Sequence, residues 1–230
     1  AGIGRRPLAV KRVAERTGVN IILGCGFYVD DTHPEWVKNA SIEELKEAIM
    51  HDVKIGIDGT DIKTGVIGEI GVSPAKMTDS EQNVLRAAAR AQIESGLAMT
   101  VHTFEGWLSS ENRQTLHVID ILEQEGVALN KVYMSHIDQT TDWDYVARVA
   151  EKGVYVSFDN TGTFEWPHGF DSWGAVTPTD YERAQAIKML IERGFLRQIL
   201  LSHDVCWKSN LISYGGVGYA YIPQSMPKVL

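Results

Sequence analysis

The stretch Lys63–Gly71, KTGVIGEIG, decides the fold class of this chain. Val66, Ile67 and Ile70 are β-branched residues typical of a buried strand, and glycines interrupt the run. Glu69 places a carboxylate inside this apolar segment, where burial costs several kcal/mol unless a cation or hydrogen bonds compensate it. We therefore interpret the stretch as a buried strand that ends at a polar site.

Three later apolar runs also end in a residue type that binds metals. They are LAMTVHT, which reaches His102, KVYMSHID, which reaches His136, and ILLSHD, which reaches Asp204. Successive residues of a strand face opposite sides of the sheet. If the ligand-type residue at the end of each run faces inward, alternate apolar residues of that run face the helices. Together with Glu69, they indicate one metal site at the carboxyl edge of a parallel sheet.

Helix-like and strand-like segments alternate along the whole chain, which implies βα units and a parallel sheet. A (β/α)8 barrel, or TIM barrel, has eight strands in roughly 250 residues. The sequence therefore predicts an α/β fold in which residues 1–230 form a single barrel domain, seen as a partial chain that lacks the first two strands and a C-terminal part. The predicted strands are 19–26, 63–71, 97–103, 131–138, 154–159 and 198–204, and the predicted helices are 7–17, 41–57, 78–96, 111–125, 143–152 and 181–193. Ser41 with Glu44 and Thr78 with Glu81 form capping-box sequences at the starts of the second and third helices, and Gly96 ends the third.

Composition and charge narrow the class of partner. The 230-residue chain is 44% hydrophobic, which is ordinary for a globular protein, and its formal net charge of −8 disfavours a nucleic-acid groove. No apolar run approaches the roughly 18 residues of a membrane span. Cys25 and Cys206 are far apart and form no CxxC pattern, which favours a reducing compartment. We expect a cytoplasmic protein with neither a nucleic-acid nor a membrane partner.

Loops after the predicted strands supply candidates for a substrate pocket. The segment 160–178 is longer than most loops between strands and helices and is rich in aromatic residues, so it predicts a hydrophobic cover and a small-molecule substrate with an apolar portion. Cys206 is also small enough to be a buried packing residue, and packing explains Tyr28 equally well. The candidate substrate-binding residues are Tyr28, Trp107, Asn160, Trp166, Cys206 and Trp207.

The order of several motifs resembles the phosphotriesterase family of the amidohydrolase superfamily, and within it the phosphotriesterase-related proteins. These motifs are GCGFY, IKTGVIGEIG, LRAAARAQIESG, TVHT, SHID, SFDNTG and ILLSHD, and they cover nearly the whole chain. The resemblance implies a (β/α)8 barrel with two divalent metal ions, usually zinc, with manganese or cobalt as alternatives. It also implies an HxH pair on the first strand, which this sequence does not contain, in agreement with two missing strands. Relatives are commonly homodimers.

The resemblance implies a role for each strand-end residue. Glu69 would bridge the two metal ions, His102 and His136 would hold the more exposed ion, and Asp204 would bind the buried ion and act as the catalytic proton acceptor. Two divalent ions about 3.5–4 Å apart share a hydroxide that can attack a carbonyl or phosphoryl centre. The expected enzyme is a metal-dependent hydrolase of carboxylic esters, lactones or N-acyl amides, with phosphotriesterase activity as a side reaction.

Two other functions are compatible with the sequence. A TatD-like metal-dependent phosphodiesterase or nuclease carries a similar IGEIG run, but it has ETD at the last strand and needs basic clustering beside the site. A catalytically inactive barrel that acts as a binding protein is the second alternative, because the HxH pair is missing. The ligand candidates also have structural alternatives: a core ion pair for Glu69, satisfied core histidines for His102 and His136, and a helix cap for Asp204.

Overall fold

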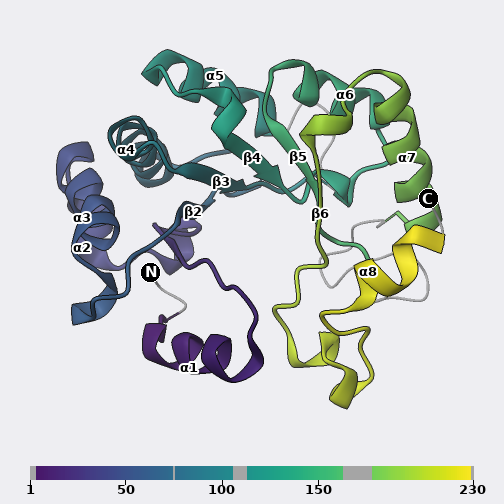
Figure 1. Cartoon of the computed structure of the whole chain (residues 1–230). Helices are drawn as coiled ribbons and strands as arrows, with labels where there is room; N and C mark the ends of the chain where they lie inside the picture. Colours follow the sequence, from purple (N-terminus) through teal and green to yellow (C-terminus); the bar gives the residue numbers. More distant parts are fainter. Residues whose placement is uncertain (1–3, 75, 106–112, 163–177, 229–230) are drawn as a thin grey trace. The chain divides into compact units, whose positions relative to one another are not determined.

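The computed structural model describes residues 4–74, 76–105, 113–162 and 178–228 of the chain (Figure 1). In these residues six strands form a parallel α/β fold, in the order β1-β2-β3-β4-β5-β6. This confirms the predicted fold class and the predicted number of strands. The strands are β1 (Gly24–Cys25), β2 (Val66–Gly71), β3 (Ala98–His102), β4 (Val132–Ser135), β5 (Tyr155–Phe158) and β6 (Ile199–Leu201).

The chain divides into two compact units, which are described separately. The first consists of Ala1–His102 with Gln114–Tyr133, and the second of Thr103–Arg113 with Met134–Leu230. The first unit carries helices α1 (Pro7–Thr17), α2 (Glu35–Asn39), α3 (Ile42–Lys54), α4 (Asp79–Ser95) and α5 (Thr115–Glu125). The second carries α6 (Trp143–Glu151), α7 (Asp180–Glu192) and α8 (Tyr221–Ser225).

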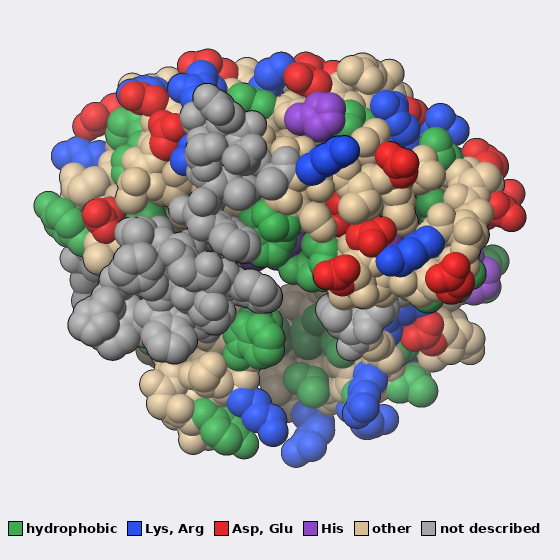
Figure 2. All heavy atoms as spheres, turned by 180° about the vertical axis from the view of Figure 1, so that it is seen from behind, with side chains coloured by type: hydrophobic (Ala, Val, Ile, Leu, Met, Phe, Trp, Pro, Cys, Tyr) green, Lys and Arg blue, Asp and Glu red, His purple; other side chains and the backbone are tan. Residues whose placement is uncertain are grey.

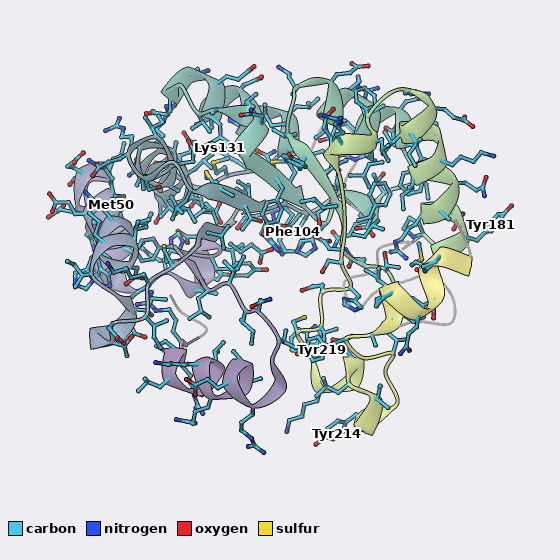
Figure 3. The ribbon with its side chains drawn as sticks, in the orientation of Figure 1. Met50, Phe104, Lys131, Tyr181, Tyr214 and Tyr219 are labelled. Atoms are coloured by element: carbon cyan, nitrogen blue, oxygen red, sulfur yellow. The ribbon has the colours of Figure 1, made fainter. Side chains whose placement is uncertain are left out.

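Helices α3 and α4 of the first unit begin where the sequence predicted, at two capping boxes. The hydroxyls of Ser41 and Thr78 each accept a hydrogen bond from the backbone N–H three residues further on. The two helices lie side by side in Figure 1, with apolar side chains such as Leu45 and Leu85 fully buried. Helix α4 ends at Gly96, whose carbonyl accepts a hydrogen bond from the ammonium of Lys131 at 2.9 Å (Figure 3).

The predicted strand 19–26 is much shorter in the structure. Only Gly24 and Cys25 are assigned to β1, where they pair with Val66 and Ile67 of β2. The preceding Ile22 is 73% exposed. The prediction of a buried strand from residue 19 is therefore wrong, because the strand assignment begins only at Gly24 and the side chains of Val19, Ile21 and Ile22 are exposed.

Strand β2 contains an irregularity beside Glu69. Ile67 pairs with Met99 of β3 and Ile70 pairs with Val101, so three steps along β2 match two steps along β3. An extra residue of this kind is a β-bulge, which changes the direction of the side chains around it. Simple alternation along β2 therefore does not determine which residues share a face with Glu69.

In the second unit, β6 pairs in parallel with β5, and its last residue, Leu201, lies beside Phe158. The backbone N–H of Ser202 still donates to the carbonyl of Phe158 at 2.9 Å, but the strand does not continue. Asp204 has a φ of 38°, outside the extended region. The predicted extension of this strand to Asp204 is therefore wrong, and Asp204 lies in the turn that follows β6.

Helix α7 of the second unit also begins at a capping box, in which Thr179 accepts from the backbone N–H of Glu182. Tyr181 projects outward from this helix and is 66% exposed (Figure 3), whereas Arg183, two residues later, is buried. Among the described residues, no helix has the length and apolar composition that crossing a bilayer requires.

Candidate metal centre

Glu69, His102 and His136 are the described candidates for metal ligands, because carboxylate oxygens and imidazole nitrogens are common metal donors. Glu69 lies in β2 and His102 ends β3, both in the first unit, whereas His136 follows β4 in the second unit. The surroundings of each side chain within its own unit decide how it can act as a ligand.

In the first unit, Glu69 and His102 come from neighbouring parallel strands and face each other. A carboxylate oxygen of Glu69 lies 3.5 Å from Nδ1 of His102. His102 is buried, but the side chain of Glu69 is 36% exposed. The expectation that Glu69 is buried is therefore wrong, because the bulge in β2 lets its carboxylate reach solvent while Ile67 and Ile70 remain buried.

Tyr28, from the loop after β1, contacts the same imidazole. Its hydroxyl oxygen lies 2.8 Å from Nε2 of His102 and 3.2 Å from Nδ1, and the two rings meet edge to face. A phenol within 3.2 Å of both ring nitrogens and a carboxylate beside Nδ1 together fix the orientation of this histidine. The structure thus brings together three of the residues that the sequence proposed, namely Tyr28, Glu69 and His102.

The loop that carries Tyr28 is anchored to the start of α4. Nε2 of His33 lies 2.6 Å from the carbonyl oxygen of Tyr28, and Nδ1 lies 2.8 Å from the hydroxyl of Ser80. The fully buried Glu81 accepts hydrogen bonds from the backbone N–H groups of Asp30 and Ser73. The sequence marked Glu81 only as a capping-box residue and gave no sign that it also joins two strand-end loops.

In the second unit, His136 is held by Asp159, the residue that follows β5. His136 is 4% exposed, and its backbone N–H donates to both carboxylate oxygens of Asp159, at 2.9 and 3.0 Å. Nδ1 of the ring lies 2.8 Å from Oδ1 of the same carboxylate. Burial raises the pKa of Asp159, while the neighbouring His136 acts in the opposite direction.

Asp159 belongs to a buried polar network that extends to α7. The side-chain amide of Asn160 donates to Asp159 at 3.1 Å and to Asp138 at 3.0 Å, and its backbone N–H also donates to Asp138. Arg183 donates from Nε to Asp138 at 2.8 Å and from Nη1 to Asp180 at 3.3 Å. The sequence proposed Asn160 as a substrate-binding residue; the structure places its amide nitrogen in this network.

The remaining candidates of the second unit lie after β6. Asp204, Cys206 and Trp207 are all exposed, and the thiol of Cys206 lies 3.7 Å from Oδ2 of Asp204. The alternative in which Cys206 is a buried packing residue is therefore wrong, because its side chain is exposed. Trp107, Trp166 and most of the predicted 160–178 loop lie outside the described residues.

The donor atoms fit a transition metal. Imidazole nitrogens and a carboxylate oxygen suit zinc, manganese or cobalt. Nδ1 of His136 lies against the carboxylate of Asp159, so Nε2 is the ring nitrogen that does not face this carboxylate. His102 presents Nδ1 towards Glu69, so the carboxylate and this nitrogen can serve the same ion.

The two cysteines are expected to differ strongly in reactivity. Burial raises the pKa of the Cys25 thiol to about 11, and since the thiolate is the reactive form, Cys25 should not react with a disulfide reagent at pH 8. The exposed Cys206 should react at once. Titration of the native protein should therefore modify one thiol per chain, and titration after denaturation should modify two. Rapid modification of both thiols in the native protein would contradict the described packing around β1.

The fold and these side chains define a class: parallel α/β proteins with carboxylate and imidazole groups at the ends of their strands. The chain belongs to the phosphotriesterase family, because the model of that family matches residues 1–230. This confirms the family that the order of sequence motifs indicated.

Three similar proteins illustrate the resemblance. The N-acetyltaurine hydrolase of Xenopus tropicalis is 38% identical over 231 residues, which cover 100% of this chain and 64% of that protein. A resiniferatoxin-binding protein from Rhodobacter sphaeroides matches with a TM-score of 0.90 and 37% identity over 98% of this chain and 61% of its own. A lactonase from Listeria monocytogenes matches with a TM-score of 0.84 and 29% identity, over 98% and 69% of the two chains. The chain thus spans less than two thirds of the first two proteins.

Proposed function

We propose that this protein is a metal-dependent hydrolase with a binuclear centre, which cleaves carboxylic esters, lactones or N-acyl amides. The observation that carries the proposal is the pairing of the Glu69 carboxylate with the His102 imidazole on neighbouring strands. Membership of the phosphotriesterase family and similarity to a protein named as a hydrolase support the same reaction class.

Four side chains would hold the two metal ions, with zinc as the first choice: Glu69, His102, His136 and Asp204. When bound, such ions polarise a carbonyl group and make water reactive near neutral pH. Tyr28 keeps the His102 ring in place through the contact at Nε2. Asp204 is an exposed carboxylate, and we assign it the acceptance of the proton that is released during hydrolysis.

Among possible substrates, we place N-acyl amides of small amino acids or aminosulfonates first, because relatives with 38% identity are named N-acetyltaurine hydrolases. The lactonase relative makes lactones the second class. Acidic and basic side chains are interspersed over the upper part of the face in Figure 2, whereas several basic side chains gather at its lower edge. The formal net charge of −8 disfavours a polyanionic partner such as a nucleic acid. We retain a small molecule with an apolar portion as the substrate, a cytoplasmic location, and a homodimer as a proposed assembly.

A substrate panel with and without chelator tests this proposal. N-acyl amino acids, N-acetyltaurine, aryl esters, lactones and a phosphotriester would be offered to the purified protein. Turnover of at least one carboxylic substrate should disappear when a chelator removes the metal and return when zinc, manganese or cobalt is added back. Turnover that chelator leaves unchanged would overturn the metal-dependent mechanism.

The similarity to a protein named for binding resiniferatoxin favours a second candidate, in which the chain binds an apolar ligand without cleaving it. Calorimetry with ligands of that kind, on the metal-loaded protein, distinguishes the two candidates. Saturable binding with no product from any member of the panel would favour the binding protein over the hydrolase.

A further inference from the structure

We infer that Asp159 is a positioning residue that locks the His136 ring in one tautomer, with the proton on Nδ1 and the lone pair on Nε2. The consequence for metal binding rests on the proposed function. The tautomer itself is a property of the metal-free protein and can be measured there.

The backbone of His136 gives the first reason. His136 has a φ of 61°, in the left-handed region that few non-glycine residues occupy. Such a conformation persists where its surroundings fix it, and here the backbone N–H donates to both carboxylate oxygens of Asp159. The residue that holds this backbone also contacts the ring, so the main chain and the imidazole are oriented by one carboxylate.

The ring contact gives the second reason. Oδ1 of Asp159 lies 2.8 Å from Nδ1 of His136, within the range of a strong hydrogen bond to a carboxylate. A carboxylate that already accepts the backbone N–H needs a donor at this ring nitrogen, so the proton is placed on Nδ1. The lone pair then lies on Nε2, which points the donor atom of the neutral ring away from Asp159.

The support behind Asp159 gives the third reason. Asn160 donates its amide to Asp159 at 3.1 Å, and Asp138 accepts from both the amide and the backbone of Asn160. Arg183 then fixes Asp138 from α7. Because Asp138 and Arg183 are at most 1% exposed, the carboxylate of Asp159 is held from a rigid, buried base.

The experiment compares imidazole ¹⁵N spectra of the metal-free protein above pH 8, with the His136 signals assigned from a His136→Gln variant. Wild type should show one His136 tautomer, protonated at Nδ1. Asp159→Asn should lose this preference, and Asn160→Ala, which keeps the carboxylate but removes its amide donor, should weaken it. Asp142→Asn is the matched control, because Asp142 caps α6 in the same unit and asparagine caps equally well. Its His136 spectrum should match wild type.

Zinc affinity is the second readout. Asp159→Asn should bind zinc about 10–100-fold more weakly than wild type, the usual effect of removing a carboxylate that orients a histidine ligand. An unchanged tautomer in both network variants would overturn the inference. A changed tautomer with unchanged zinc affinity would support the control of the tautomer by Asp159 and overturn its consequence for metal binding. If wild type itself binds no zinc, the proposed function fails, while the spectra still decide whether Asp159 sets the tautomer.

Discussion

Replacing Glu69 with glutamine is expected to abolish tight metal binding and to lower kcat/KM for any hydrolysed substrate by more than about 100-fold. Changes to groups that merely support a metal ligand already cost about 10–100-fold, and Glu69 is proposed as a ligand itself. A neutral amide is a weak ligand and provides no charge to compensate two divalent ions. Metal analysis after dialysis and steady-state kinetics measure both effects.

Glu94→Gln is the matched control for this change. Glu94 lies in the same unit, and its side chain is 38% exposed against 36% for Glu69, but it pairs with Lys46 and Lys54 on the outer surface. These lysines lower the pKa of Glu94 to about 2. The control should keep wild-type metal content and activity. A Glu69→Gln protein that retained its metal would contradict the assignment.

Replacing Arg183 with methionine is expected to destabilise the protein by about 3–5 kcal/mol, the usual cost of removing one partner of a buried ion pair. Arg183 is 1% exposed and donates to Asp138, which is fully buried. Methionine fills similar volume, so the main effect is the loss of the charge that compensates Asp138. Urea unfolding followed by fluorescence measures the change in the free energy of unfolding.

Arg193→Met is the control for the ion-pair effect. Arg193 follows α7 and pairs with Asp144, but both side chains are at least 45% exposed. An exposed pair of this kind contributes at most about 1 kcal/mol. If Arg183→Met were no more destabilising than Arg193→Met, the buried network could not be a structural base for Asp159.

Much of the fold could be predicted because local chemistry determines it. The capping boxes at Ser41 and Thr78 and the glycine after α4 depend on hydrogen bonds within a few residues, and the structure has them where predicted. Strand ends could not be predicted in the same way. They depend on pairing partners, which is why β1 is limited to Gly24 and Cys25 and β6 ends at Leu201.

For the candidate site, the sequence suggested possible ligands but not the residues that support them. His102 and His136 are buried as expected, because each ends an apolar run. The exposure of Glu69 depends on a bulge that is defined only by pairing with β3. Asp159 and Arg183 were missed because they meet His136 and Asp138 across sequence separations of 23 and 45 residues, and no local pattern reports such contacts.

The proposed ligands Glu69, His102 and His136 can be located by a crystal structure of the zinc-loaded protein, with anomalous data collected on both sides of the zinc absorption edge. We expect anomalous peaks within bonding distance of a Glu69 oxygen, a His102 nitrogen and Nε2 of His136. Zinc bound elsewhere on the chain, with these three side chains free of metal, would contradict this proposal.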